Sequence, residues 1–499
     1  LNKTEEIVVL SLREILSNAN WILWASLSDL LPLLAEAAPD EFLENVEVSL
    51  LKIPCPYVTI FEQEGDGVTG WNYLTGLLWA LETLAWEEEF LVRVTVILGE
   101  LACRDPGGNW ANRPSNSLST IFLPWYPQTI ASIEKRMVAL QTLFKEVPEV
   151  AWKLLISLLP NQHQMSAGSH KPAWRNSIPE SWTGKVTNKE YWEQVSLYSE
   201  FAVDQAKKNI DKLKEIIDNL ENLPKTAFEK VLIYLSSDSV SRESDDIKLG
   251  LWTTLINFAT KHERYSEADW ALDSALVSKI KEIANKLEPK NPINLYSRLF
   301  NDDDFDLYEE DGDWEAQEKQ LENRRCHALK SIVGYGGIAA VFKLIEIAES
   351  PTKVGSILGI IDEYNFDSII IPELLVDDNI KFEQFSNAYV WGRYNKLGWQ
   401  WVDSIEKKGW SELHVARFFM CLPFSINTWE KLIHINPDAV EIYWNKVHVR
   451  PYQLGSEVNS AVDNLIKYGR PNAAIECLYM NIHHKRPIDK ARAIRALLS

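Results

Sequence analysis

The sequence predicts an all-α protein built from degenerate helix-hairpin repeats, with few or no strands. Apolar residues recur at helical spacing in many segments, for example in residues 7–16 and 228–235. A helix-start signal, in which proline precedes an acid and an amphipathic stretch, recurs at Pro39, Pro148 and Pro437. We therefore expect many helices of about 10 to 20 residues joined by short loops.

Recurring helix starts between short loops are what stacked helix pairs require, as in the superhelices of tetratricopeptide and HEAT arrays. The recurrence has no fixed period, so independent helices that share a start signal remain an alternative to repeats. Strand signals are confined to two short stretches, 57–61 and 368–371, and each has a proline beside it. The sequence thus favours helices along nearly its whole length.

Size and charge restrict the class of protein. The chain has 499 residues and a mass of 57.2 kDa, which is more than one hydrophobic core normally spans. Its 71 acidic residues outnumber 51 Lys and Arg, for a net charge of -20. Phosphate backbones and anionic lipids repel such a chain, so we expect no direct nucleic-acid partner and no membrane partner. The short basic cluster 483–486 is expected to be a solvated loop.

The cysteines and the first residues indicate the compartment. Five cysteines are scattered without a CxxC pair or zinc-ligand spacing, which is typical of reduced thiols in a cytoplasmic protein. The chain start lacks the basic and apolar regions of a signal peptide, and no run of 18 apolar residues occurs. The missing initiator Met suggests a fragment of a longer polypeptide, whose upstream part could hold the chemistry.

Three stretches interrupt the helical pattern. Residues 53–70 and 160–188 are rich in proline and glycine and are expected to be long loops. The second is interpreted as a domain boundary or as a loop packed over a groove. The third is 288–293, and the acidic run 302–313 that follows it is expected to be a solvated linker.

These interruptions suggest three segments. Residues 1–175 would form an N-terminal helical-repeat segment that includes an Asp-Pro-Gly-Gly loop. Residues 176–300 would form a middle helical segment after the long linker loop, and residues 301–499 a C-terminal helical-repeat segment.

Recognised catalytic and metal-binding motifs are absent from the sequence. The run 302–313 alternates aspartates like a calcium loop, but Leu307 stands where the sharp turn needs glycine. There is no P-loop, no H-E-x-x-H and no G-x-S-x-G, and Gly334–Gly337 is expected to end one helix and begin the next. We therefore predict no catalytic residue, no metal and no cofactor in this chain.

The chain is rich in tryptophan, with 20 in 499 residues. Tryptophans and carboxylates together are compatible with a carbohydrate-active α/α-toroid enzyme, in which two acids flank the scissile bond. The simpler reading is that tryptophans such as Trp152, Trp252 and Trp270 fill gaps between helices. The cluster of Trp391, Trp399 and Trp401 could form an exposed recognition patch.

The most distinctive local segment is 101–114, where the chain leaves a helix and turns at Asp-Pro-Gly-Gly. Its polar and aromatic side chains indicate either a rigid loop that satisfies its own hydrogen bonds or a docking surface for a protein ligand. Together with two residues further on, they form the candidate ligand surface: Asp105, Asn109, Trp110, Asn112, Arg113, Trp174 and Arg175. If that surface binds a ligand, replacing Arg113 and Trp174 by alanine should weaken binding more than folding.

Several segments together resemble a known family. They are 81–86, 105–114, 121–125, 127–129, 150–152, 158–160, His163 and 171–175, followed by 311–315, 422–424 and 469–474. This string resembles the C-terminal helical sensor region of bacterial STAND NTPases of the antiviral AVAST type, which are analogues of NOD-like receptors. The resemblance touches most of the chain and is dense only in residues 70–175.

The resemblance implies that different parts of a longer protein carry the ATPase, effector and sensor functions. An upstream ATPase and an N-terminal effector would be missing here, and this cytoplasmic chain would be the sensor of a bacterial innate immune protein. Such a sensor binds a phage protein, such as the terminase or the portal, and binding triggers oligomerisation of the full-length protein and activates the effector. We therefore expect a non-catalytic protein-binding region. The alternatives are the carbohydrate-active enzyme and an architectural protein-protein interaction scaffold.

Overall fold

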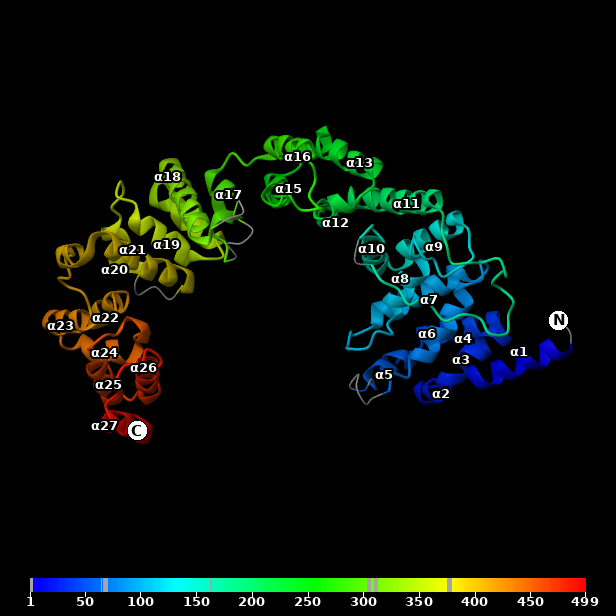
Figure 1. Ribbon diagram of the computed structural model, residues 1–499, viewed down its shortest axis with the longest axis horizontal. Helices are drawn as coiled ribbons and strands as arrows, with labels where there is room; N and C mark the ends of the chain where they lie inside the picture. Colours follow the sequence, from blue (N-terminus) through cyan, green and yellow to red (C-terminus); the bar gives the residue numbers. More distant parts are fainter. Residues whose placement is uncertain are drawn as a thin grey trace. The chain divides into compact units, whose positions relative to one another are not determined.

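The computed structural model describes residues 3–63, 65, 71–161, 164–302, 307–308, 313–374 and 379–499, with the backbone alone for 372–374 (Figure 1). The described residues form helices and contain no strand, so the predicted all-α helical-repeat fold is confirmed. Several sequence features lie outside the described residues: Gly67, Gly70, His163, and residues 303–306 and 309–312 of the acidic run with the rejected calcium-loop pattern.

The chain divides into two compact units, Leu1–Arg242 and Glu243–Ser499. The boundaries expected from sequence, near 175 and 300, fall inside unit 1 and unit 2 respectively. The division into three segments stays a prediction. Each unit is described by itself below.

Unit 1 consists of α-helices and short 3-10 helices (η). They are α1 (Lys3–Leu16), α2 (Trp21–Ser26), η1 (Ser28–Leu30), α3 (Leu31–Ala37), α4 (Pro39–Leu51), α5 (Pro56–Glu62), α6 (Thr75–Ala85), α7 (Leu91–Arg104), α8 (Pro114–Phe122), α9 (Ile133–Glu146), α10 (Pro148–Ser157), α11 (Asn188–Ala206), α12 (Ile210–Ile217), η2 (Leu220–Asn222), α13 (Lys225–Leu235) and α14 (Asp238–Ser241).

Helices of unit 1 pack on near neighbours in sequence, as a repeat architecture requires. Helix α3 packs on α6, α7 packs on α8 and α9, and α11 packs on α12 and α13. Large aromatic side chains fill the spaces between them, and Trp24, Phe42, Tyr57 and Trp86 are fully buried. Trp24, Trp86 and Trp152 are therefore core residues of this unit, whereas Trp71, Trp79, Trp125, Trp174 and Trp192 are exposed.

The sequence signals for helix starts are largely confirmed. Pro39 and Pro148 occupy the first turns of α4 and α10, where a missing N–H costs no hydrogen bond. Pro437 lies outside its helix instead, because α24 begins at Ala439. Side-chain caps also begin helices, as in α11, where Thr187 and Glu190 form a reciprocal capping box.

Unit 2 has the same all-helical composition. Its helices are α15 (Asp245–Arg264), α16 (Ser274–Leu287), α17 (Pro292–Tyr296), η3 (Ser297–Phe300), α18 (Trp314–Ile347), α19 (Pro351–Ile360), α20 (Asp367–Leu374), α21 (Ile380–Ser404), α22 (Glu412–Met420), α23 (Ile426–Ile435), α24 (Ala439–Lys446), η5 (Pro451–Gln453), α25 (Val458–Lys467), α26 (Pro471–His483) and α27 (Lys490–Leu498).

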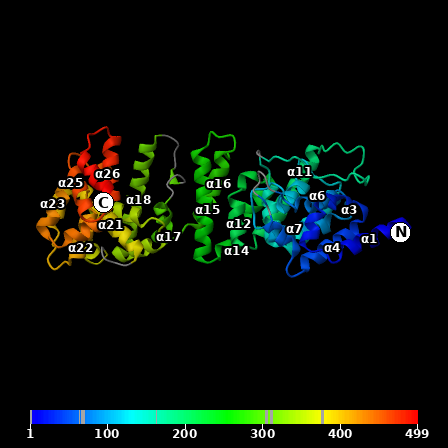
Figure 2. The same ribbon diagram turned by 90° about the horizontal axis from the view of Figure 1, so that it is seen from below.

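Pairs of helices that follow one another in the chain are the packing unit here. Helices α15 and α16 lie side by side, and so do α25 and α26 (Figure 2). Helices α19 and α21 pack so closely that a Cβ added to Gly355 of α19 would lie 2.1 Å from the carbonyl oxygen of Phe385 in α21. Glycine is thus needed at this crossing.

Helix α18 is long and apolar. Among the described residues it is the one helix that could cross a membrane by length and composition, but the core helix of a soluble protein passes the same test. Leu329, Ile332 and Leu344 of α18 are buried in the core of unit 2. The chain leaves helical geometry at Gly336 and Gly337, where φ of Gly337 is 63°, so the predicted break at this glycine cluster is confirmed.

Three local expectations are wrong. The two candidate extended stretches are helical, since 57–61 lies in α5 and 368–371 lies in α20. The expected long loop 53–70 therefore contains a helix that starts after Cys55. The proposed exposed patch also fails at Trp401, because this side chain is buried and donates from Nε1 to the carboxylate of Asp367 at 2.8 Å.

Candidate functional site

The distinctive loop between α7 and α8 is closed by a buried ion pair. Arg113 donates from Nη1 to Oδ1 of Asp105 at 2.9 Å, and both side chains are about nine-tenths buried. The same Asp105 oxygen accepts the backbone N–H of Gly107 at 2.9 Å, which holds the turn. Asp105 and Arg113 are therefore turned inward to the loop rather than outward to a ligand.

The next residues of this loop form hydrogen bonds with the segment that precedes α6 and with the first residue of α6. Trp110 donates from Nε1 to the carbonyl oxygen of Gly65 at 2.9 Å, and Asn112 donates from Nδ2 to Oγ1 of Thr75 at 3.2 Å. Asn72 donates in turn to the carbonyl oxygen of Asn112 at 3.4 Å. These bonds attach the loop to the start of α6 and bring Trp110 and Asn112 into one wall of a pocket.

We call this cavity of about 760 Å³ the aromatic pocket. The described residues that line it come from α2, η1, the start of α6 and the loop: Ala25, Ser26, Ser28, Asp29, Trp71, Asn72, Tyr73, Thr75, Gly76, Trp79, Trp110 and Asn112. Three of its aromatic side chains reach the surface, because Trp71 is 72%, Trp79 41% and Tyr73 39% exposed. Large exposed aromatics gathered at one concave site are typical of binding sites.

The floor of the pocket depends on a glycine. A Cβ on Gly76 would lie 1.8 Å from the carbonyl oxygen of Ser28, so only glycine lets α6 approach η1 this closely. Ser28 also donates from Oγ to the carbonyl oxygen of Tyr73 at 3.0 Å and accepts the N–H of Gly76 at 3.3 Å. The backbone that carries Tyr73 is thus fixed to the floor.

A long segment without helix, residues 164–187, crosses the helices of unit 1, and we call it the strap. Its backbone is held by one buried carboxylate, since Glu36 of α3 accepts N–H groups from three consecutive residues, Ala173, Trp174 and Arg175, at 2.7 to 2.9 Å. Arg175 also forms an ion pair with Glu87. The strap therefore packs on other segments of unit 1, among them α3.

His170 connects the strap to the aromatic pocket. Its ring stacks on Trp79 with a centroid distance of 5.3 Å and an interplanar angle of 20°. Its Nδ1 lies 3.0 Å from Oγ1 of Thr83, and its carbonyl oxygen accepts from Nε1 of Trp86 at 3.0 Å. The orientation of Trp79 in the pocket wall is therefore supported by the strap.

The contact between strap and α6 includes a buried acid. Glu82 accepts the backbone N–H of His170 at 2.8 Å and the hydroxyl of Ser117 at 2.6 Å. Burial raises the pKa of Glu82, and these two hydrogen bonds partly oppose the rise. Because both oxygens serve the strap and α8, Glu82 acts as a structural carboxylate.

The structure distributes the seven predicted surface residues over four places. Trp110 and Asn112 line the aromatic pocket, and Asn109 is exposed on the loop. Asp105 and Arg113 form the buried pair described above. Trp174, which is 77% exposed, and Arg175 lie on the strap and are not among the described residues that line the pocket.

Sequence reasoning missed Trp71, Tyr73, Trp79 and Asp29. Trp71 and Tyr73 follow the glycine-rich stretch that was expected to be an ordinary loop, and Trp79 lies in a helix whose other large residues are mostly buried. The one sequence signal for Trp71, Tyr73 and Trp79 is that they lie within residues 70–175, where the family resemblance is densest, and Asp29 has no such signal. Exposure of their rings depends on tertiary packing, which local patterns do not contain.

Fold and site together define an all-helical protein of the repeat type with an aromatic pocket in its first unit. No protein-family model matches the chain, and no curated protein and no solved structure matches it either. In the described part of the chain, no group of three or more His, Cys, Asp or Glu side chains is placed to hold a metal ion.

Proposed function

We propose that this chain is a non-catalytic ligand-sensing region that binds a protein through the aromatic pocket of unit 1. The observation that carries the proposal is the gathering of Trp71, Tyr73 and Trp79 around one concave site of about 760 Å³. Tryptophan and tyrosine are the residues that most often dominate the energy of protein interfaces. A pocket of this kind suits an apolar or aromatic side chain that projects from a partner protein.

The polar groups of the pocket specify the ligand further. Asn72 and Asn112 carry amides that can donate to and accept from a peptide backbone. Asp29 is the one charged side chain among the described lining residues, and the whole chain carries a net charge of -20. Both features favour a ligand with a basic face around its apolar anchor.

We propose further that the chain belongs to a bacterial antiphage STAND NTPase and that its ligand is a phage protein, such as the terminase or the portal. Support comes from the family resemblance, whose densest part, residues 70–175, includes Trp71, Trp79, Trp110 and part of the strap. In this scheme ligand binding to the cytoplasmic sensor permits oligomerisation of the full-length protein and activates its effector.

A carbohydrate-active enzyme is the second candidate, because exposed tryptophans beside Asn and Asp side chains also suit sugar rings. Hydrolysis of a glycosidic bond normally needs two carboxylates about 5 to 10 Å apart. The described lining residues supply one, Asp29. This favours binding over catalysis at the pocket, whichever ligand occupies it.

The test uses affinity capture from bacteria infected with a panel of phages. The baits are the wild-type chain, the pocket variant Trp71→Ala with Tyr73→Ala, and the control Trp192→Ala, which removes a 52% exposed tryptophan from α11 of the same unit. We expect the wild-type chain and the control to retain one phage protein, and the pocket variant to retain at least about tenfold less of it, because loss of about 1.4 kcal/mol of binding free energy lowers affinity tenfold and a single interface aromatic can contribute about 2 kcal/mol.

Thermal melting of each bait shows whether a loss of capture reflects binding. Both replaced side chains of the pocket variant are partly exposed, so its melting temperature should remain close to that of the control. Equal capture by the pocket variant and the wild-type chain would contradict the proposal. Capture of the chain's own copies alone would favour an architectural scaffold, and saturable binding of a glycan at the pocket would favour the second candidate.

A further inference from the structure

The buried arginines of this chain differ in how their charge is compensated. Arg113 and Arg393 each form an ion pair with a largely buried carboxylate, that of Asp105 and that of Asp367. Arg136 of α9 is equally buried, with 8% of its surface exposed, but it forms no ion pair within the described part of the chain. An unpaired charge that is removed from water costs free energy, and a bound anion would recover part of it.

One neutral side chain holds the guanidinium of Arg136 in place. Its Nη1 donates to Oε1 of Gln194 at 2.7 Å, whereas its Nε is buried and has no hydrogen-bond partner among the described residues. Gln194 is fixed in turn, because its Nε2 donates to the carbonyl oxygen of Phe122 at 3.2 Å and to the hydroxyl of Tyr198 at 2.7 Å. The guanidinium is therefore oriented before any ligand binds, which lowers the cost of binding.

Neighbouring groups compensate the charge of Arg136 only in part. Burial lowers the pKa of Arg136, because removal from water penalises the charged form, and Tyr198 and Glu190 oppose this shift incompletely. Glu190 lies in the first turn of α11, where its Oε2 accepts the backbone N–H and the hydroxyl of Thr187, both at 2.8 Å. The carboxylate of Glu190 thus caps its own helix.

Arg136 lines a cavity of about 290 Å³ in unit 1, which we call the Arg136 cavity. Segment 127–130, α9, the start of α11 and the strap contribute its walls. The charged residues of its described lining are Arg136, Lys185 and Glu190, so basic side chains outnumber acidic ones in a chain whose net charge is -20. The cavity therefore favours an anion more than the rest of the chain does.

The other walls of the Arg136 cavity are largely apolar. They come from Pro127, Ile130, Pro179, Trp182 and Val186. The ring of Trp182 is held from behind, since it packs edge to face on Trp86 with a centroid distance of 4.9 Å, and Nζ of Lys171 lies 4.4 Å from its centroid. A flat apolar group suits these walls.

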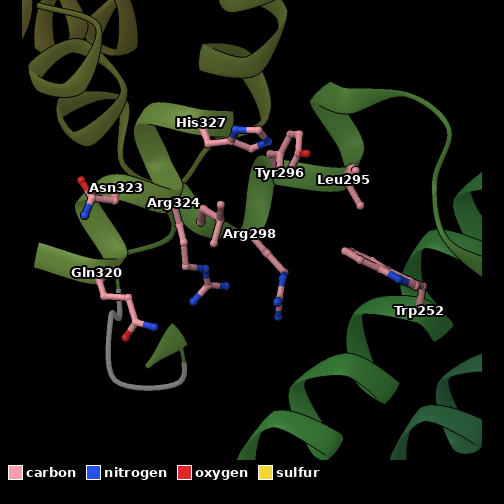
Figure 3. Close-up of a pocket in the computed structure, with 9 residues that line it drawn as sticks. Trp252, Leu295, Tyr296, Arg298, Gln320, Asn323, Arg324 and His327 are labelled. Carbon is pink, nitrogen blue, oxygen red and sulfur yellow. The ribbon is translucent and has the colours of Figure 1, made fainter. Parts of the chain in front are cut away.

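The larger cavity of unit 2 differs in the state of its arginines. Figure 3 shows this cavity of about 470 Å³, whose described lining includes Arg298 and Arg324. Arg298 donates from Nη1 to Oδ1 of Asn257, and Arg324 donates from Nη1 to the carbonyl oxygen of Leu307, both at 2.7 Å. Both guanidinium groups are thus engaged, and we infer no ligand for this cavity.

We propose that the Arg136 cavity binds a small carboxylic acid with a flat apolar body. The carboxylate accepts hydrogen bonds from the guanidinium of Arg136, which matches its planar shape, and the body lies against Trp182. A phosphate group would need more donors than Arg136 and Lys185 supply, and it would leave the apolar walls without a matching group. The Arg136 cavity shares no described lining residue with the aromatic pocket, so this inference is independent of the function proposed above.

The test is calorimetric titration of the whole chain with benzoate, benzamide and acetate at low ionic strength, in a buffer without other carboxylates, phosphate or sulfate. We expect one benzoate to bind per chain with a dissociation constant below about 1 mM. Benzamide has nearly the same shape without the charge, and acetate has the charge without the ring. Each should therefore bind about tenfold or more weakly than benzoate.

Two variants test the site from different directions. Arg136→Gln removes the proposed anchor and should abolish measurable binding of benzoate. Because Arg136 is buried, Lys185→Glu provides a second test at an exposed position of the lining. It should weaken benzoate binding about fivefold, because it reverses one charge near the carboxylate. The control Lys225→Glu makes the same change of charge at an exposed residue of α13, outside the described lining, and should leave binding unchanged.

Three results would overturn the assignment. The first is no saturable binding of benzoate by the wild-type chain, and the second is binding of benzamide as tight as that of benzoate. The third is benzoate binding that Lys185→Glu weakens no more than Lys225→Glu does.

Discussion

At the scale of single residues, the ion pair between Asp105 and Arg113 explains why the loop after α7 keeps one shape. Both charges are largely removed from water, and the carboxylate of Asp105 is compensated by the guanidinium of Arg113. The pair also positions the chain that leads to Trp110 and Asn112 in the pocket wall. Arg113 thus acts on the pocket through the loop backbone and has no place in its described lining.

Replacing Arg113 by alanine should therefore destabilise unit 1, because the change leaves a buried carboxylate without its cation. The expected cost is about 3 kcal/mol or more, or a melting temperature lower by about 6 °C or more. Differential scanning calorimetry of the whole chain measures this in the transition of unit 1.

The matched control for this change is Arg104→Ala at the end of α7. Arg104 forms a pair with Glu100, four residues earlier in the helix, in which both side chains are about one third exposed, and pairs at this helical spacing contribute about 0.5 kcal/mol or less. Equal melting temperatures for the two variants would contradict a structural role for the buried pair. The expectation that replacing Arg113 and Trp174 together weakens ligand binding more than folding stays a prediction.

The sequence predicted some residues of the site and not others for identifiable reasons. Asp105 and Gly107 are residue types that favour turns, so the loop could be predicted from the sequence. This loop contains Trp110 and Asn112, which line the pocket. Trp71 and Trp79 carry no local signal that separates an exposed ring from a buried one such as Trp86. Their exposure follows from contacts made with distant segments, for example the stacking of His170 on Trp79, 91 residues away in the chain.

At the scale of secondary-structure elements, the crossing of α19 and α21 shows how strongly packing in unit 2 depends on small residues. Glycines lie at the contact from both helices: a Cβ on Gly355 would lie 2.1 Å from Phe385, and one on Gly392 would lie 2.5 Å from Ser356. In each case the obstructing atom is a backbone carbonyl oxygen, which cannot rotate away. The helices would have to separate to accept any side chain there.

We therefore expect Gly355→Ala to destabilise unit 2 although alanine is the better helix former. Overpacking costs about 1 to 3 kcal/mol, and separation of two helices places this change at the upper end, with a melting temperature lower by about 6 °C. Thermal unfolding followed by circular dichroism measures the shift.

A second glycine-to-alanine change in the same unit separates packing from helix propensity. Gly334 of α18 has no atom within 4 Å of the position of an added Cβ. Gly334→Ala should therefore leave unit 2 unchanged or stabilise it by up to about 1 kcal/mol. If both variants raised the melting temperature, close contact between α19 and α21 would be refuted.

Helices that begin with a proline and an acidic residue could be predicted from the sequence. Short apolar runs could not be assigned to helix or strand from the sequence. Prolines and acids mark the starts of α4 and α10, and their first turns need those residue types. The run 57–61 is rich in aromatic and β-branched residues, as strands are, yet it forms part of α5. Burial of Tyr57 and Phe61 among neighbouring helices outweighs that local preference.

At the scale of the whole molecule, the two units carry cavities with different linings. Unit 1 has an aromatic pocket supported by the strap, and unit 2 has a cavity lined by arginines within an acidic chain. The all-α class was predictable because helical spacing recurs along the chain. The division at residue 242 was not, because contacts rather than loop composition define the units.

The central claim is that the aromatic pocket contacts a protein ligand, and site-specific photo-crosslinking in infected cells tests it most directly. A photoreactive phenylalanine derivative replaces either Trp71, which is 72% exposed in the pocket, or Trp192, which is 52% exposed on α11. We predict a covalent adduct with one phage protein from position 71 and none from position 192. Adducts with that protein from position 192 alone, or none from position 71 in cells where the chain still captures it, would contradict the claim.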